Sequence, residues 1–249
     1  MVRNTRTHSN QPTKPGKLMS ISALALYGSR ARNDHAESSD TDLFAITTDA
    51  NYKMIVEGKI NIACYPREQA FSRAEGGDLY FMHIVKEGKT IYDINNDFQE
   101  VKNRFTYKES YLHEIEAATN LGRALIKNRK TVQNFLFFNK RLVWCIRTML
   151  IARTAERRAP VFSADALAST FNDRRIWETI KIKSESTYEK KAYTLAEELF
   201  ETYGTPAAGE IPSNYHELID YFKSSNNEVG FKTAKLLAKD QDTGEYDWI

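Results

Sequence analysis

Long apolar runs are missing from this chain of 249 residues. No segment approaches the roughly 18 consecutive apolar residues that predict a membrane-spanning helix. The N-terminus is polar and lacks the apolar stretch of a secretory signal peptide. We therefore expect a cytoplasmic protein without direct membrane insertion.

Cysteine is also scarce, because the chain has only two, Cys64 and Cys145. Both lie within apolar segments, and their separation matches no metal-binding motif. This argues against a disulfide framework and favours two buried free thiols, which suits a reducing compartment.

A strong charge imbalance is missing as well. The formal net charge is +2, so no overall field indicates nucleic-acid binding.

The remaining composition is that of a globular protein, with 41% hydrophobic residues and a length that suits one large domain or two small ones. Residues 18–95 mix short apolar strands with short helices, whereas residues 96–239 follow helical periods. We expect an α+β fold, with a small mixed sheet and its helices followed by an all-helical half. Residues 1–17 are predicted to be a flexible arm and residues 240–249 a C-terminal tail.

The expected elements follow from apolar spacing and from turn residues. Strands are predicted over 43–46, 60–65 and 89–93, and the apolar segment 21–26 is either a strand or a helix end. Helices are predicted over 66–75, 78–88, 107–129, 132–158, 163–171, 176–182, 187–203, 213–222 and 228–239. The long helix over 132–158 carries basic side chains to which we assign no role, since most such side chains are solvated: Lys140, Arg141, Arg147 and Arg153.

The clearest chemical pattern lies between residues 26 and 46. Gly28 allows the backbone to approach another group closely, and Ser29 supplies a hydroxyl and a backbone N–H at a helix start, where an anion can bind. Asp40 and Asp42 are two residues apart at a strand start, so their carboxylates point to the same face. Neighbouring carboxylates repel each other unless a divalent cation lies between them. The pattern predicts a triphosphate cradle facing a site for Mg²⁺ or Mn²⁺.

This order of Gly28-Ser29 and then Asp40-x-Asp42, followed by the apolar Leu43, resembles the signature of the polymerase-beta nucleotidyltransferase superfamily. Residues 28–32 read Gly-Ser-Arg-Ala-Arg, which is similar to the small bacterial members, and residues 77–93 resemble the closing part of the same fold. The resemblance implies a transferase of the EC 2.7.7 type that moves a nucleotide from a nucleoside triphosphate to a hydroxyl.

The resemblance also implies roles for individual residues. The residues implied for nucleotide binding are Gly28, Ser29 and Arg32. Asp40 and Asp42 are implied as the catalytic, metal-binding pair. A third carboxylate commonly lies on the strand that here covers 60–65, and its position corresponds to Asn61. Asparagine keeps an oxygen acceptor but carries no charge, so the third metal ligand is Asn61, is supplied from elsewhere, or is missing.

The tail ends in Tyr246-Asp-Trp-Ile. It either docks its aromatic residues on the core or offers the Tyr246 phenol as an acceptor for nucleotides. With this tyrosine and this layout, the chain resembles the nucleotidyltransferase of Hailong-type bacterial anti-phage systems. That resemblance implies polymerisation of deoxy-ATP into short DNA primed on a C-terminal tyrosine, with the DNA product restraining a membrane effector.

Other acceptors stay open at this point. ATP or dATP is the expected substrate, and an oligonucleotide is the expected product. One alternative is a protein-modifying (AMPylating) transferase of the antitoxin type, and an antibiotic is a further candidate acceptor. Another is a catalytically weak nucleotide-binding module that regulates a partner, which Asn61 favours. Sequence patterns do not fix the base, the sugar or the oligomeric state.

Overall fold

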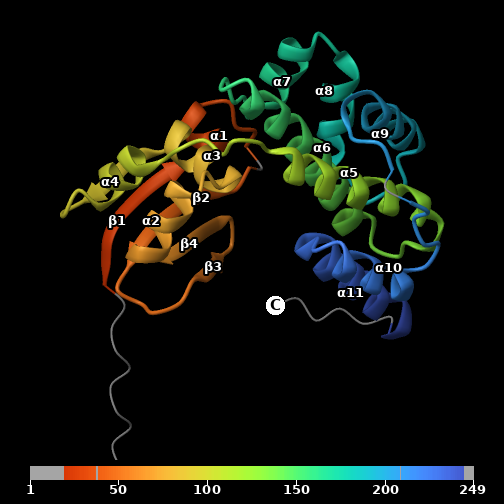
Figure 1. The fold of residues 1–249 in the computed structure, drawn as a ribbon, viewed down its shortest axis with the longest axis horizontal. Coiled ribbons are helices and arrows are strands. Elements are labelled where there is room, and N and C mark those ends of the chain that lie inside the picture. Colours follow the sequence, from red (N-terminus) through yellow and green to blue (C-terminus); the bar gives the residue numbers. More distant parts are fainter. Residues whose placement is uncertain (1–19, 38, 208, 244–249) are drawn as a thin grey trace, which may run out of the picture. The chain divides into compact units, whose positions relative to one another are not determined.

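The computed structural model describes residues 20–37, 39–207 and 209–243, with side chains through residue 239. The predicted α+β class is confirmed (Figure 1). The chain forms two compact units. The first contains the described residues through Ala74 together with Ile84–Phe105, and the second contains Glu75–His83 and the described residues from Thr106 onward. The predicted arm over residues 1–17 lies outside the described residues.

The first unit is built on a five-stranded mixed sheet with the strand order β3-β4-β2-β1-β5. Its strands are β1 (Ile21–Tyr27), β2 (Thr41–Thr47), β3 (Lys53–Glu57), β4 (Ile60–Pro66) and β5 (Lys89–Asp93). β2 runs parallel to β4, and all other neighbouring strands are antiparallel. β3 returns the chain to β4 through a hairpin at Gly58, so the parallel pair forms without a crossover helix.

Helix α4 (Asp97–Arg104) packs on β1 and β5 of this sheet. Helix α2 (Arg67–Glu75) contacts α4, since the ring of Phe71 lies 4.4 Å from the Arg104 guanidinium. The ring of Phe98 in α4 lies 5.8 Å from that of Phe44 in β2, and both residues are fully buried. In α2, Arg73 donates to the hydroxyl of Tyr65, which alternation places on the same face as Phe44. The two helices therefore cover the face of β2 and β4 that carries Phe44 and Tyr65.

Helix α4 is not among the predicted helices, because its eight residues include only two large apolar ones, Phe98 and Val101. Its N-terminus is satisfied by the preceding strand, since the Asp93 carboxylate accepts hydrogen bonds from the backbone N–H groups of Phe98 and Gln99. A short polar helix of this kind gives almost no periodic signal. Helix α3 (Leu79–Glu87) was expected, and Asp78 caps it by accepting from the N–H groups of Tyr80 and Phe81.

The second unit is helical, as predicted. Its helices are α5 (Leu112–Lys127), α6 (Phe135–Glu156), α7 (Ala164–Phe171), α8 (Arg174–Ile180), α9 (Lys190–Tyr203), α10 (Tyr215–Ser224) and α11 (Glu228–Thr243), with short 3₁₀ turns at Arg129–Thr131 and Lys181–Ser184. The expected cap at Ser163 is confirmed, since its hydroxyl accepts from the N–H of Ala166. The expected end of the last helix at residue 239 is wrong, because α11 continues to Thr243 through a run with no glycine or proline.

Helices α5, α6 and α9 pack against one another in this unit. The buried hydroxyl of Tyr193 in α9 donates to the side-chain oxygen of Asn139 in α6 at 2.7 Å. The Asn139 amide in turn donates to the carbonyls of Glu185 and Thr187, so this buried polar group is fully paired. At the other end, Arg153 donates to the carbonyls of Tyr203 and Gly204 beyond the end of α9.

Both cysteines are buried and free, as predicted. Burial raises the pKa of the Cys145 thiol to about 12, so this thiol stays protonated and unreactive at neutral pH. Within the described ranges, no helix is both long and apolar enough to cross a bilayer.

We predict that Gly122→Ala destabilises the helical unit. Alanine normally stabilises a helix relative to glycine, but a Cβ here would collide with the ring of Phe200. Overpacking of this kind should lower the free energy of unfolding by about 1–3 kcal/mol, measured by urea denaturation. The matched control is Gly209→Ala, where a Cβ meets no atom within 4 Å. Equal stability of the two variants would show that α5 and α9 are not packed as described.

Candidate functional site

The first turn of the candidate site joins β1 to the short helix α1 (Gly28–Arg32). Gly28 has a φ of +75°, a conformation that favours glycine. A Cβ at this position would also lie 3.2 Å from a carboxylate oxygen of Asp42. The backbone conformation therefore favours glycine, and the Asp42 carboxylate lies directly against the bare backbone of the turn.

Asp42 has its second neighbour on β4. The parallel register pairs Asp42 with Asn61, and the Asn61 amide nitrogen donates to the Asp42 carboxylate at 3.1 Å. Both residues are half-buried. The structure thus brings together Gly28, Asp42 and Asn61, which lie on three different elements and to which the resemblance assigns roles in nucleotide and metal binding.

Asp40 lies immediately before β2 and is exposed. Its backbone is held by Arg30, which donates to the carbonyls of Ser39 and Asp40 at 2.8 and 3.2 Å. Arg30 is a positioning residue that our sequence interpretation missed. Its only signal is its place inside the Gly-Ser-x-Ala-Arg pattern, since a contact to a backbone carbonyl leaves no trace in side-chain spacing.

Arg32, which the resemblance implies as a nucleotide ligand, is engaged by two carboxylates. Its guanidinium contacts Asp34 at 2.9 Å and Glu87 at 2.5 Å. Partial burial acts to lower the pKa of Arg32, but these two acids outweigh it and the pKa is raised. A phosphate would have to compete with Asp34 and Glu87 for this group, so the proposed role of Arg32 stays a prediction. Ser29 lies beside Gly28 in the same turn, and its carbonyl accepts from the N–H of Asp34.

The donors at this site suit a magnesium ion that is bound together with a triphosphate. No group of three or more histidine, cysteine, aspartate or glutamate side chains that could hold a metal occurs among the described residues. Mg²⁺ does not need such a group, because it keeps waters and phosphate oxygens and takes only one or two carboxylates from the protein. Rotation of the Asn61 amide by 180° would place its oxygen beside Asp42. The bare Gly28 backbone leaves the facing Asp42 oxygen uncovered by any side chain of that turn.

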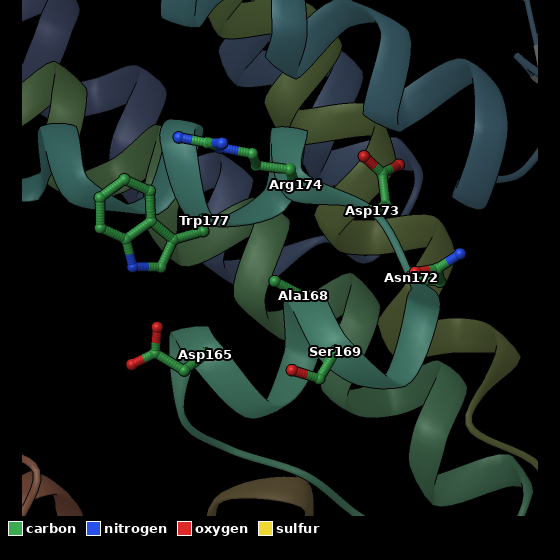
Figure 2. A pocket seen from close by; sticks show the side chains of 7 residues that line it. All are labelled: Asp165, Ala168, Ser169, Asn172, Asp173, Arg174 and Trp177. Atoms are coloured by element: carbon green, nitrogen blue, oxygen red, sulfur yellow. The ribbon is translucent and has the colours of Figure 1, made fainter.

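A separate hollow of about 530 Å³ lies on the helical unit between α7 and α8 (Figure 2). Its lining residues are Asp165, Ala168, Ser169, Asn172, Asp173, Arg174 and Trp177. Asp173 is engaged by Arg175 and by the Tyr203 hydroxyl, and these hydrogen bonds, from Arg175 above all, hold the pKa of its carboxyl below the usual value. Asp173 is therefore already paired, and none of the site residues predicted from the sequence lines the hollow. Tyr246, the predicted primer, lies outside the described residues.

Comparison with known proteins bears on the first unit. Residues 16–97 match the family described as Polymerase beta, Nucleotidyltransferase, a range that includes the five strands of the sheet and the candidate site residues from Gly28 to Glu87. Among solved structures, the chain is similar to a nucleotidyltransferase-like protein from Exiguobacterium sibiricum 255-15, with 16% identity, a TM-score of 0.31, and coverage of 90% of this chain and 86% of that one. No curated protein sequence matches the chain. The family match supports nucleotidyl transfer as the general activity of this region.

We predict that Asn61→Asp makes stability depend on divalent metal. A third carboxylate placed against Asp42 adds like-charge repulsion, which should lower the free energy of unfolding by roughly 1–2 kcal/mol in EDTA. Mg²⁺ or Mn²⁺ should reverse this loss and raise the melting temperature more than it does in the unsubstituted protein. Thermal melts with and without metal measure both effects. The control is Asn51→Asp, on an exposed loop. The same metal response in both variants would contradict a metal site at Asp42.

Proposed function

We propose that this chain is a magnesium-dependent nucleotidyltransferase that moves a nucleotide from a nucleoside triphosphate to a hydroxyl. The observation that carries the proposal is the Asp42 carboxylate, held against the bare Gly28 turn and hydrogen-bonded to Asn61, within a region that matches a nucleotidyltransferase family. Asp40 stands two residues before Asp42, with its backbone anchored by Arg30.

Each residue has a distinct task in this proposal. Asp40 and Asp42 hold the cation, with the Asn61 oxygen as a third, neutral ligand. The Gly28-Ser29 turn accommodates the β- and γ-phosphates, because no Cβ stands between the Gly28 backbone and the Asp42 carboxylate. Mg²⁺, when bound, neutralises phosphate charge and favours the ionised form of the acceptor hydroxyl. The hydrogen bonds from Arg30 hold the backbone of Ser39 and Asp40 in advance, which limits reorganisation of this loop during the reaction. The Asn61 amide rotates to present its oxygen and gives up its hydrogen bond to Asp42.

For the acceptor, we propose that nucleotides are added to a growing strand that starts on the Tyr246 phenol, giving an oligonucleotide or short DNA from dATP or ATP. This product would act as a signal in bacterial anti-phage defence and would control a membrane effector. The support is the sequence around Tyr246, where Gly244, a residue of high conformational freedom, stands two residues before the phenol. A phenol is a weak nucleophile at pH 7, so it needs the metal site for activation.

A second candidate function is a nucleotide-binding module with weak catalysis that regulates a partner. Asn61 favours it, because the superfamily commonly carries a third carboxylate at this position and no acidic or histidine side chain replaces it within the described residues. A protein-modifying transferase of the antitoxin type remains the alternative for the acceptor.

We expect Asp40→Asn and Asp42→Asn each to reduce transfer by at least about 100-fold, because each removes a charge that holds the cation. Thermal stability should not fall much, since both changes relieve carboxylate repulsion. Purified protein is incubated with each labelled nucleoside triphosphate and Mg²⁺ or Mn²⁺ and then resolved on denaturing gels. Glu68→Gln, on the exposed face of α2, is the control. Full turnover in either aspartate variant would exclude this site.

The same assay separates the candidate functions. A ladder of products indicates polymerisation, and one nucleotide added to a partner protein indicates modification. Binding of the triphosphate without turnover indicates the regulatory module.

Tyr246→Phe tests the primer directly, because it removes only the hydroxyl. The unsubstituted protein should gain mass in whole nucleotide units on incubation with the correct triphosphate, and the variant should lose this adduct and the product while it still binds nucleotide. Intact mass spectrometry and peptide mapping measure both. The control is Tyr188→Phe, at an exposed tyrosine. Tyr203→Phe is unsuitable, because the Tyr203 hydroxyl donates to Asp173. An adduct on another residue would assign the primer elsewhere.

A further inference from the structure

Helix α6 carries an unusual excess of positive charge for a central helix. Between Phe135 and Ala155 it contains Lys140, Arg141, Arg147 and Arg153 and no acidic residue. Two of these arginines are used within the protein. Arg153 donates to the carbonyls of Tyr203 and Gly204, and Arg147 donates to that of Phe162. Lys140 is exposed to solvent.

Arg141 differs from these three residues. It is half-buried at the edge of the packed face, next to Phe138 and Cys145, which are fully buried on the preceding and following turns. Its Nε atom is buried and has no hydrogen-bond partner in the part of the chain that the structure describes. No carboxylate or carbonyl there contacts the rest of the guanidinium either. Burial lowers the pKa of Arg141.

Two aromatic rings hold this guanidinium in place. Its central carbon lies 5.6 Å from the ring centre of Phe137, one turn before it, and 5.6 Å from that of Trp144, one turn after it. Cation–π contacts on two sides restrict the side chain and leave its N–H donors free for an external acceptor. The two terminal nitrogens are not among the buried unpaired atoms, so they remain accessible.

A partly desolvated guanidinium without an acceptor is unfavourable, and an oxyanion is the group that best relieves it. We propose that Arg141, held between Phe137 and Trp144, is an anion-binding residue of the helical unit that takes a phosphate group of a nucleotide. The need for an oxyanion follows from the geometry, whereas its identity as a nucleotide phosphate rests on the proposed function. The phosphate belongs either to a free nucleoside triphosphate or to the backbone of a single-stranded oligonucleotide. Both rings are half-buried, so part of their surface remains available to a base.

The test measures binding to the full-length protein in EDTA, which removes metal-dependent binding at Asp40 and Asp42. The first probe is a fluorescently labelled oligodeoxyadenylate of about ten nucleotides, whose binding is measured by fluorescence anisotropy. The second probe is ATP, which is added as a competitor. Arg141→Gln should weaken binding of the affected probe by roughly 10- to 100-fold, the effect of losing a charged hydrogen bond. Arg141→Lys should retain part of the affinity that Arg141→Gln loses. Lys140→Gln, which removes an exposed neighbouring charge, should change binding by no more than about threefold.

The probe that loses affinity identifies the source of the phosphate. Loss for the oligonucleotide alone assigns a strand-binding site, and loss for ATP as well assigns a site for free triphosphate. Either result supports the proposal. Arg141→Gln with unchanged affinity for both probes would overturn it, and so would unsubstituted protein that binds neither.

Thermal melts distinguish ligand binding from a structural role. Arg141→Gln should lower the melting temperature less than Arg153→Gln does, because it loses two cation–π contacts but no hydrogen bond to the described residues. Arg153→Gln, which removes the donor to two carbonyls, should melt lower. If Arg141→Gln lowers the melting temperature as much as Arg153→Gln does, Arg141 is structural. Asp42→Asn should retain Arg141-dependent binding. If the unsubstituted protein transfers no nucleotide but shows Arg141-dependent binding, the proposed function fails and the anion site stands.

Discussion

The parallel pairing of β2 with β4 is the constraint on which the candidate site depends. In this register Asp42 lies beside Asn61, and two residues further along, Phe44 lies beside Ala63 in the core. Because side chains alternate along a strand, burial of Phe44 against Phe98 determines the face to which Asp42 points. A slip by one residue would turn Asp42 to the opposite face and Phe44 out of the core. The apolar packing of the sheet therefore positions the polar groups at the start of its two parallel strands.

The arginines of the chain show how burial and pairing decide what a cation does. Arg30 donates to a backbone carbonyl in the loop before β2, and Arg153 donates to one at the end of α9, so each holds a chain segment in place. Arg32 forms ion pairs with Asp34 and Glu87 beside the candidate site, so its charge is already compensated there. Arg141 has neither kind of acceptor in the described structure and is held by aromatic rings instead. Identical side chains thus differ in function because their surroundings differ in available acceptors.

Local patterns predicted the larger part of the fold. Helices α5, α6 and α9 follow apolar spacings of three and four, and their ends lie within a few residues of the predicted ones. The strands around Phe44 and Ala63 are apolar runs bounded by turns. Helix α4 was missed because its stability comes from Phe98 docking on the sheet and from a cap supplied by Asp93, and neither signal is periodic.

By itself, the sequence determined the α+β class, the helical second half, and the pairing of a Gly-Ser turn with two closely spaced aspartates, since each of these depends on residues near one another in the chain. Only the tertiary structure decided that the Asn61 amide faces Asp42, that Gly28 lies against the same carboxylate, that Arg32 is already engaged, and that Arg141 has no acceptor among the described residues. The first three facts depend on contacts between residues 14 to 55 positions apart. The fourth depends on how one face of α6 is buried. Contacts of that kind arise from the folded arrangement as a whole, so no local spacing encodes them.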